Sequence, residues 1–172
     1  KLTRLMELVD ELRAEGQRML IFSQFTSHLA LVKAALDAKG VTSQQLDGST
    51  TAKDRKKLVQ AFQEGSDPVF LISLKAGGVG LNLTAATNVI LLDPWWNPAV
   101  EDQASDRAHR IGQQQPVPVY RLVAMNTVEE LMLSLHARKR ALIAEVLEGK
   151  SAAGKLSTDE LLALLAARPA RT

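Results

Sequence analysis

Apolar residues recur along this chain at two spacings, and the two spacings predict helices that alternate with buried strands. Between residues 2 and 12, leucine or valine returns every three or four positions, which is typical of the buried face of an amphipathic helix. Elsewhere apolar residues form short continuous runs, which indicate strands buried on both faces. The runs predict strands over 18–22, 41–46, 69–72, 88–93 and 117–123. Pro118 favours either an edge position for the last strand or a bulge at its start, because proline has no N–H to donate.

Helix start signals lie between these runs. Ser27 can cap a helix whose apolar face begins at position 29. Thr51 and Asp54 have the spacing of a capping box with Asp in place of Glu, and Thr127 and Glu130 have the same spacing. We therefore expect helices behind each of these three starts. The last of them should continue to 147, with a separate short helix over 158–167.

Strands that alternate with helices, and that are apolar along their whole length, predict an α/β fold with a parallel sheet covered by helices on both faces. The alternation stops at Asn126, so we expect one α/β domain over 1–126 and a C-terminal helical extension over 127–172. In such sheets ligands bind at the carboxyl ends of the strands. That edge would bring together residues 23–24, 47–49, 73–80 and 93–97.

Composition narrows the chemistry without naming a function. The 172 residues carry a net charge of +2 and no cysteine, so disulfides, thiolate metal ligands and cysteine nucleophiles are excluded. No apolar run is long enough to predict a membrane span, and the first residues lack the continuous apolar core of a signal peptide. The chain begins with Lys1 rather than Met, so we expect a fragment of a longer protein.

The segment EDQASDRAHRIGQQQ predicts a helix that carries a polar stripe. At about 100° per residue, Arg107 and Arg110 both fall within about 40° of Gln103. Gly112 then ends the helix. Taken alone, such a stripe favours a solvated face, where an acid–base pair four residues apart stabilises a helix by only about 0.3 kcal/mol. The alternative is a pair of guanidinium groups presented to a ligand.

A glycine-rich segment follows the strand predicted at 69–72. It contains Lys75, Gly77, Gly78 and Gly80. Glycines after a strand let backbone N–H groups approach an anion closely. The segment matches neither the Walker A pattern nor GxGxxG, so a tight strand-to-helix turn stays open as the alternative interpretation.

No segment has the features of a complete nucleotide or metal site. The GKS at 149–151 follows a predicted helix rather than a strand, and Ala144 stands where the first P-loop glycine belongs. No predicted strand ends in paired acids suited to Mg²⁺. His28, His109 and His136 do not have the spacing of metal ligands.

Two further features have competing interpretations. Trp95 and Trp96 are the only tryptophans, and they either pack at the edge of the sheet or form a rigid platform at an interface or beside a nucleic acid strand. The basic run 138–140 is either a solvated helix face or a phosphate contact.

Four segments, taken in order, resemble the C-terminal RecA-like lobe of the Swi/Snf-family ATPases, which are superfamily-two DNA translocases. The resemblance covers nearly the whole chain. The segments are RMLIFSQF (18–25), LDGSTTAKDR (46–55), LISLKAGGVGLNLTAATNVILLDPWWNP (71–98) and QASDRAHRIGQ (103–113). The last resembles motif VI of the family nearly letter for letter. The tail STDELLALL looks like the ending of bacterial members, so we expect a bacterial, cytoplasmic protein associated with the nucleoid.

The resemblance implies roles in ATP hydrolysis. Arg107 and Arg110 match the arginine fingers that reach an ATP held by the other lobe, and Gln103 would orient or couple at the same interface. Guanidinium groups suit this role because phosphoryl transfer spreads negative charge over the γ-phosphate oxygens. The residues that match the family's nucleotide-sensing motif V region are Lys75, Gly77, Gly78 and Gly80.

The resemblance also implies contacts with double-stranded DNA. Gly48 and Ser49 match a contact to the phosphate backbone, and Ser73 and Lys75 match residues that touch the tracking strand. Trp96 matches the tryptophan that couples ATP hydrolysis to movement along DNA.

One departure from the family pattern limits what this chain does alone. The motifs that hold the P-loop lysine and the Mg²⁺-binding acids are absent from the sequence. ATP and Mg²⁺ would therefore be bound mainly by an N-terminal RecA-like lobe, and the fragment should be an inactive half of an ATPase. A DNA-bound protein is a further possible target. The alternatives are the second lobe of a strand-separating helicase and a non-catalytic nucleic-acid-binding module.

Overall fold

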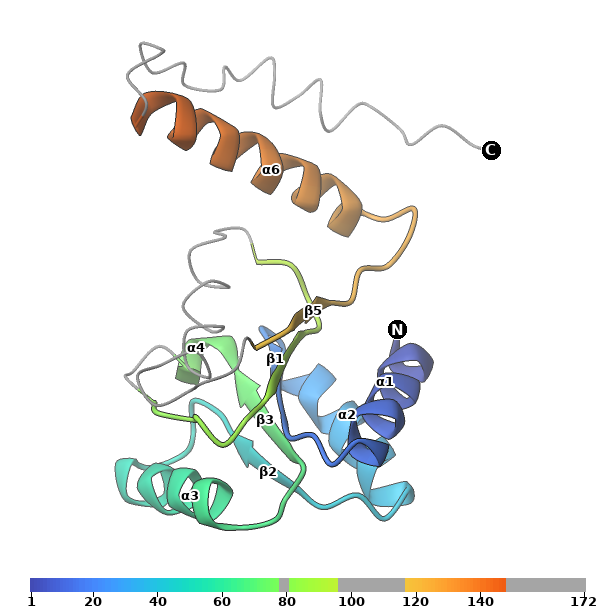
Figure 1. The fold of residues 1–172 in the computed structure, drawn as a ribbon, viewed down its shortest axis with the longest axis vertical. Helices are drawn as coiled ribbons and strands as arrows, with labels where there is room; N and C mark the ends of the chain where they lie inside the picture. Colours follow the sequence, from blue (N-terminus) through green and yellow to red (C-terminus); the bar gives the residue numbers. More distant parts are fainter. Residues whose placement is uncertain (78–80, 96–116, 148–172) are drawn as a thin grey trace. The chain divides into compact units, whose positions relative to one another are not determined.

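A computed structural model describes residues 1–77, 81–95 and 117–147 (Figure 1). The chain divides into two compact units, Lys1–Val123 and Ala124–Thr172. The first unit contains a sheet with its helices, and the second contains a long helix. Among the described residues, no helix is both long and apolar enough to cross a membrane.

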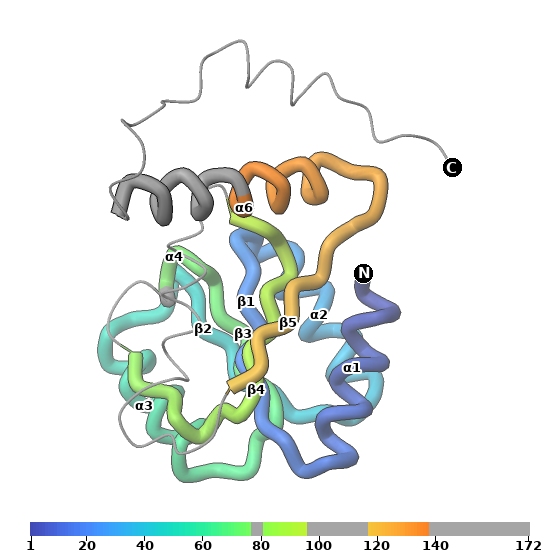
Figure 2. The backbone as a smooth tube through the Cα atoms, turned by 45° about the horizontal axis from the view of Figure 1, so that its top comes forward, coloured from blue at the N-terminus to red at the C-terminus, as the bar shows by residue number. Residues whose placement is uncertain are grey.

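The first unit is built on a five-stranded sheet in which every neighbouring pair runs parallel. Figure 2 shows the strands side by side, and their order is β2-β3-β1-β4-β5. The parallel sheet predicted from the apolar runs is confirmed. The strands are β1 (Met19–Ser23), β2 (Ser43–Leu46), β3 (Val69–Ser73), β4 (Asn88–Leu91) and β5 (Val119–Arg121).

Helices cover both faces of this sheet, as the sequence predicted. They are α1 (Leu2–Ala14), α2 (Thr26–Ala38), α3 (Ala52–Glu64) and the short α4 (Leu74–Gly77). Within β1, Met19 and Ile21 belong to a core that includes residues of α1 and α2. Leu20 and Phe22 belong to the opposite core, which includes Phe62 of α3. Successive strand residues thus alternate between two apolar layers, because side chains of a strand point to opposite faces.

The strand register brings the carboxyl ends of the strands to one level. Ser23 pairs with Ser73, and Leu46 of β2 pairs with the residue just before Ser73. On the other side of β1, Phe22 pairs with Leu91 of β4. The loops that leave these strands therefore begin at the same edge of the sheet, which we call the carboxyl edge.

Of the helix starts predicted in the first unit, one is confirmed and one is wrong. Thr51 caps α3: its hydroxyl oxygen accepts from the N–H of Asp54 at 3.2 Å. Ser27 was wrong as a cap, because α2 already begins at Thr26 and its N-cap, Phe25, makes no side-chain cap. The chain enters the helix directly after leaving β1, and this places Ser27 inside the first turn.

Strand β2 is shorter than predicted at its start. The apolar Val41 is buried, which is why the pattern suggested a strand from 41. Its N–H donates instead to Leu36 O at 2.9 Å and closes the end of α2. At the other side of the sheet, β5 lies at the edge, and the carbonyl of Pro118 accepts from Val89 N–H at 2.9 Å. The edge position expected from this proline is confirmed.

The second unit contains α6 (Val128–Leu147), so the long helix predicted from residue 128 is confirmed. Its start is a modified capping box. The Thr127 hydroxyl accepts from Glu129 N–H at 3.2 Å, and the Glu130 carboxylate accepts from Asn126 N–H at 2.9 Å. The basic side chains at 138–140 and the helix predicted over 158–167 lie outside the described parts.

Candidate functional site

The carboxyl edge holds all of the predicted site residues that the structure describes. Gly48 and Ser49 follow β2, Ser73 ends β3, and Lys75 lies in α4, which ends at Gly77. The other predicted residues lie outside the described parts of the chain. These are Gly78, Gly80, Trp96, Gln103, Arg107 and Arg110.

The turn after β2 is ordered by Asp47. Its Oδ1 accepts from both the N–H of Ser49, at 2.9 Å, and the hydroxyl of Ser49, at 2.6 Å. These bonds lower the pKa of the Asp47 carboxyl, the hydroxyl contributing most and the N–H next, while partial burial opposes them. The Asp47 N–H donates to the Thr50 hydroxyl at 3.1 Å. Both donor groups of Ser49 therefore stabilise the turn.

Gly48, at the tip of this turn, is exposed and open on its solvent side. A Cβ atom added there would meet nothing within 4 Å, and the backbone of Gly48 does not have a positive φ. The fold therefore does not require a glycine at this position. A ligand that approaches the backbone closely does require one, since any side chain would occupy that space.

The turn after β3 is held by one buried hydroxyl and one arginine. Ser73 is 3% exposed, and its Oγ accepts from Ala76 N–H at 3.2 Å. Arg55, from α3, donates through Nη1 to Ala76 O at 3.2 Å. Lys75 lies exposed between these contacts. Ser73 thus stabilises the turn from its buried side, while the Lys75 side chain is exposed to solvent.

Arg55 was not singled out in the sequence, although it lies within the LDGSTTAKDR segment. The contact to Ala76 joins two elements that are separated in sequence, so no local pattern could reveal it. Arg55 connects the helix behind the Gly48 turn to the turn that carries Lys75.

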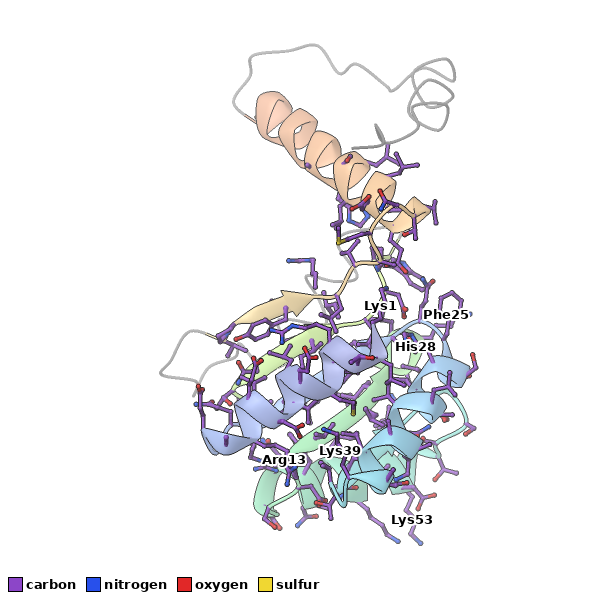
Figure 3. All side chains as sticks on the ribbon, turned by 90° about the vertical axis from the view of Figure 1, so that its right-hand side faces the viewer. Lys1, Arg13, Phe25, His28, Lys39 and Lys53 are labelled. Atoms are coloured by element: carbon purple, nitrogen blue, oxygen red, sulfur yellow. The ribbon has the colours of Figure 1, made fainter. Side chains whose placement is uncertain are left out.

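Exposed lysines lie on the helices that follow the two turns. Lys53, Lys56 and Lys57 are exposed on α3, the helix that starts directly after the Gly48 turn. Figure 3 shows Lys53 extending away from the fold. Together with Lys75 they give this region a positive charge that suits a polyanion.

A third group of contacts surrounds Asp93, which follows β4 and is 6% exposed. Its Oδ2 accepts from the Ser23 hydroxyl and from Gln24 N–H, the latter at 3.1 Å. Its Oδ1 lies 3.1 Å from Nδ1 of His28. From the sequence we expected Ser23, Gln24 and Asp93 at this edge. We examined His28 only as a possible metal ligand, so its contact with Asp93 was missed. Among the described residues, no three acidic, histidine or cysteine side chains form a metal cluster.

A hollow of about 390 Å³ lies at the opposite edge, where the strands begin. Arg18, one of its lining residues, donates through Nε to Asp67 O at 3.1 Å and through Nη2 to Phe62 O. Its guanidinium carbon also lies 4.3 Å from the centre of the Phe62 ring. Burial lowers the pKa of Arg18, which agrees with a side chain drawn into the structure.

Comparison with known proteins gives a consistent result. Residues 1–112 match the family described as "Helicase conserved C-terminal domain". The DNA repair protein RAD5A of Arabidopsis thaliana is 46% identical over 148 residues, which cover 86% of this chain and 14% of that protein. The helicase-like transcription factor of Homo sapiens is 46% identical over 149 residues, which cover 84% of this chain and 15% of that protein. The chain thus spans about one seventh of the length of these relatives.

A solved structure has the same fold. The crystal structure of the C-terminal part of the Fun30 ATPase domain matches with a TM-score of 0.75 and 38% sequence identity. The match covers 77% of this chain and 43% of that chain. The five-stranded parallel sheet with helices on both faces is therefore a RecA-like domain.

Proposed function

The chain belongs to the Swi/Snf (SNF2) family as its helicase C-terminal domain, and on that premise we propose that it is the second motor lobe of a double-stranded DNA translocase. The observation that carries the proposal is the Gly48 turn. It is ordered by Asp47, open on the side of Gly48, and followed by exposed lysines on α3. A phosphate backbone is the ligand that needs both close backbone approach and positive charge.

The geometry of the turn supports a different role for each residue at the proposed DNA contact. Ser49 donates its N–H and its hydroxyl to Asp47, so its role is to shape the turn. Gly48 leaves room for a phosphate oxygen to approach the main chain. Lys75, exposed on α4, would contribute a charge to the same strand. Such contacts do not depend on base sequence, which suits a protein that moves along DNA.

The residues that the structure describes fit a phosphate contact, and they offer no group of side chains that fits Mg²⁺. The described residues offer exposed lysines and no cluster of three metal ligands, and the sequence has no complete Walker A loop. ATP and Mg²⁺, when bound, supply the phosphoryl group and neutralise its charge, and another lobe would hold them. Arg107 and Arg110 would donate to the phosphate oxygens from this side, with Gln103 beside them.

The test is Arg110→Ala in the full-length protein, with both lobes present. Loss of an arginine finger should lower DNA-stimulated ATP hydrolysis by about 10³-fold or more. DNA affinity should stay within about twofold, because the finger serves the nucleotide rather than the duplex. Turnover is measured by phosphate release and affinity by fluorescence anisotropy.

The unmodified 172-residue chain is the control for the half-site. It should hydrolyse no ATP with or without DNA, and measurable turnover by the pure chain would contradict the proposal. A second contradiction would be an Arg110→Ala protein that binds DNA weakly yet hydrolyses ATP normally once bound. Arg110 would then be a phosphate clamp rather than a finger.

A further inference from the structure

We propose that His28 is a positioning residue: through Asp93 it fixes the path by which the chain leaves β4 and enters the segment that begins with Pro94 and Trp95. Three donors converge on the Asp93 carboxylate, which is 93% shielded from solvent at its side chain. They come from the last residue of β1, from the connection that follows it and from the first turn of α2. The carboxylate therefore joins the exit of β4 to the start of α2.

The three donors differ in the part of the fold to which they connect Asp93. Ser23 and Gln24 lie directly at the end of β1 and donate through a short side chain and the main chain. His28 donates from the first turn of α2, as the third residue of that helix. The next residue, Leu29, is fully buried in the first core, so the helix under His28 is firmly packed. The imidazole thus connects Asp93 to a rigid helix rather than to a loop.

The contact between His28 and Asp93 joins an imidazole nitrogen to a carboxylate oxygen. Nδ1 of His28 lies 3.1 Å from Oδ1 of Asp93, and it donates when it carries the ring proton. Because the Asp93 carboxyl group is shielded from solvent, water competes little for this hydrogen bond. The contact is suited to holding a chain segment in place.

The position of Asp93 constrains the residues that follow it. Pro94 has a fixed φ and no N–H, so the chain cannot pivot freely there. Trp95 then packs, half-buried, against the second apolar core. Before Asp93, Leu92 N–H donates to Phe22 O at 2.9 Å and keeps the end of β4 against β1. Figure 3 shows His28 beside Phe25 at the end of the first unit where Lys1 also lies.

The first test uses the 172-residue chain and does not require any activity. In a Trp96→Phe background, Trp95 is the only tryptophan left, and its fluorescence reports on the segment after Asp93. His28→Ala should raise acrylamide quenching of Trp95 about twofold in the folded protein, because the segment opens locally. Exchange of the Gln24 amide hydrogen should accelerate as well, since its acceptor is Asp93.

Matched variants separate positioning from general destabilisation. His28→Asn places an amide nitrogen near the position of Nδ1 and should keep the parent quenching. Lys33→Ala, on the exposed side of the same helix, removes only a surface pair with Asp37 and should also leave it unchanged. If His28→Ala does not fold, His28→Gln replaces it, because its longer side chain moves the nitrogen away from Asp93. Equal quenching in the parent and in the folded Ala or Gln variant would overturn the proposal.

The second test rests on the proposed function and uses the full-length protein, because we further propose that the position of the segment after Asp93 affects ATP hydrolysis by the motor. His28→Ala should lower the kcat of DNA-stimulated ATP hydrolysis about tenfold while the KM for ATP changes little, and His28→Asn should restore kcat. Increased quenching of Trp95 with an unchanged kcat would overturn the part of the proposal that concerns the motor. If the unmodified protein has no DNA-stimulated ATPase at all, the proposed function fails, and the quenching comparison still decides the role of His28.

Discussion

The two edges of the sheet use glycine for different purposes. At the amino edge, where strands begin, Gly16 and Gly40 have φ values of 69° and 67°, a backbone conformation that other residues adopt at a cost. Gly65, also before a strand, has no room for a side chain, because an added Cβ would lie 2.3 Å from Ala61 O. At the carboxyl edge, Gly48 has neither constraint. The fold explains the first three glycines, and the open space at the fourth is what the proposed phosphate contact would use.

Charged side chains differ between the edges in the same way. At the amino edge, Arg18 is bound to main-chain carbonyls and lies against an aromatic ring. At the carboxyl edge, Lys75 and the lysines of α3 are exposed. Mutations at the amino edge should therefore affect stability, and mutations at the carboxyl edge should affect binding.

Arg18→Ala should have the largest effect on stability. The substitution leaves the carbonyls of Phe62 and Asp67 without their donor and removes the cation from the Phe62 ring. Charge-assisted hydrogen bonds and a cation–π contact of this kind together predict a loss of about 3 kcal/mol in the free energy of unfolding. Urea denaturation followed by circular dichroism measures it. Arg13→Ala, in the same hollow but exposed, is the control, and an equal effect of both variants would contradict the prediction.

The sequence predicted the buried frame of the molecule well, for a physical reason. Burial depends largely on whether a residue's own side chain is apolar. The apolar runs therefore located β1 and β3 to within a residue or two. The failures occur where a residue far along the chain decides the outcome. Val41 is apolar, yet its N–H closes α2 instead of joining β2. His28 is a polar residue on a helix, and only the folded sheet brings Asp93 to it.

The glycine comparison gives the second prediction, and two matched substitutions test it. Gly65→Ala should lower the free energy of unfolding by about 2 kcal/mol, because the new methyl group overlaps a main-chain oxygen that cannot move easily. Gly48→Ala should change it by less than about 0.5 kcal/mol, because its Cβ points into open space. Denaturation midpoints of the two variants make the comparison.

The two glycine variants should rank in the opposite order when their DNA affinity is measured. Gly48→Ala should weaken binding of a labelled duplex about tenfold to a hundredfold, the effect of losing one hydrogen bond to a charged group. Gly65→Ala, measured at a temperature where it is fully folded, should bind as tightly as the parent. Fluorescence anisotropy at a fixed salt concentration provides the affinities. If Gly48→Ala binds DNA normally, this turn is not the backbone contact.

The smallest expected effect concerns the order of the Gly48 turn itself. The Ser49 hydroxyl, and after it the Ser49 N–H, hold the pKa of Asp47 below its usual range. A folded-state pKa below the unfolded value, about 3.9 for Asp, means that the ionised carboxylate stabilises the turn above that pH. This contribution is lost as the pH falls through the folded pKa.

An NMR titration of Asp47 and of the Ser49 amide measures this directly. Both signals should titrate together, with a midpoint below about 3.9. Ser49→Ala removes the larger of the two contributions and should move the Asp47 midpoint up toward the unfolded value. A midpoint that Ser49→Ala leaves unchanged would show that Ser49 does not hold the turn, and its hydroxyl would then be available to a phosphate. The result thus decides whether the open position beside Gly48 is built before DNA arrives or forms only on contact.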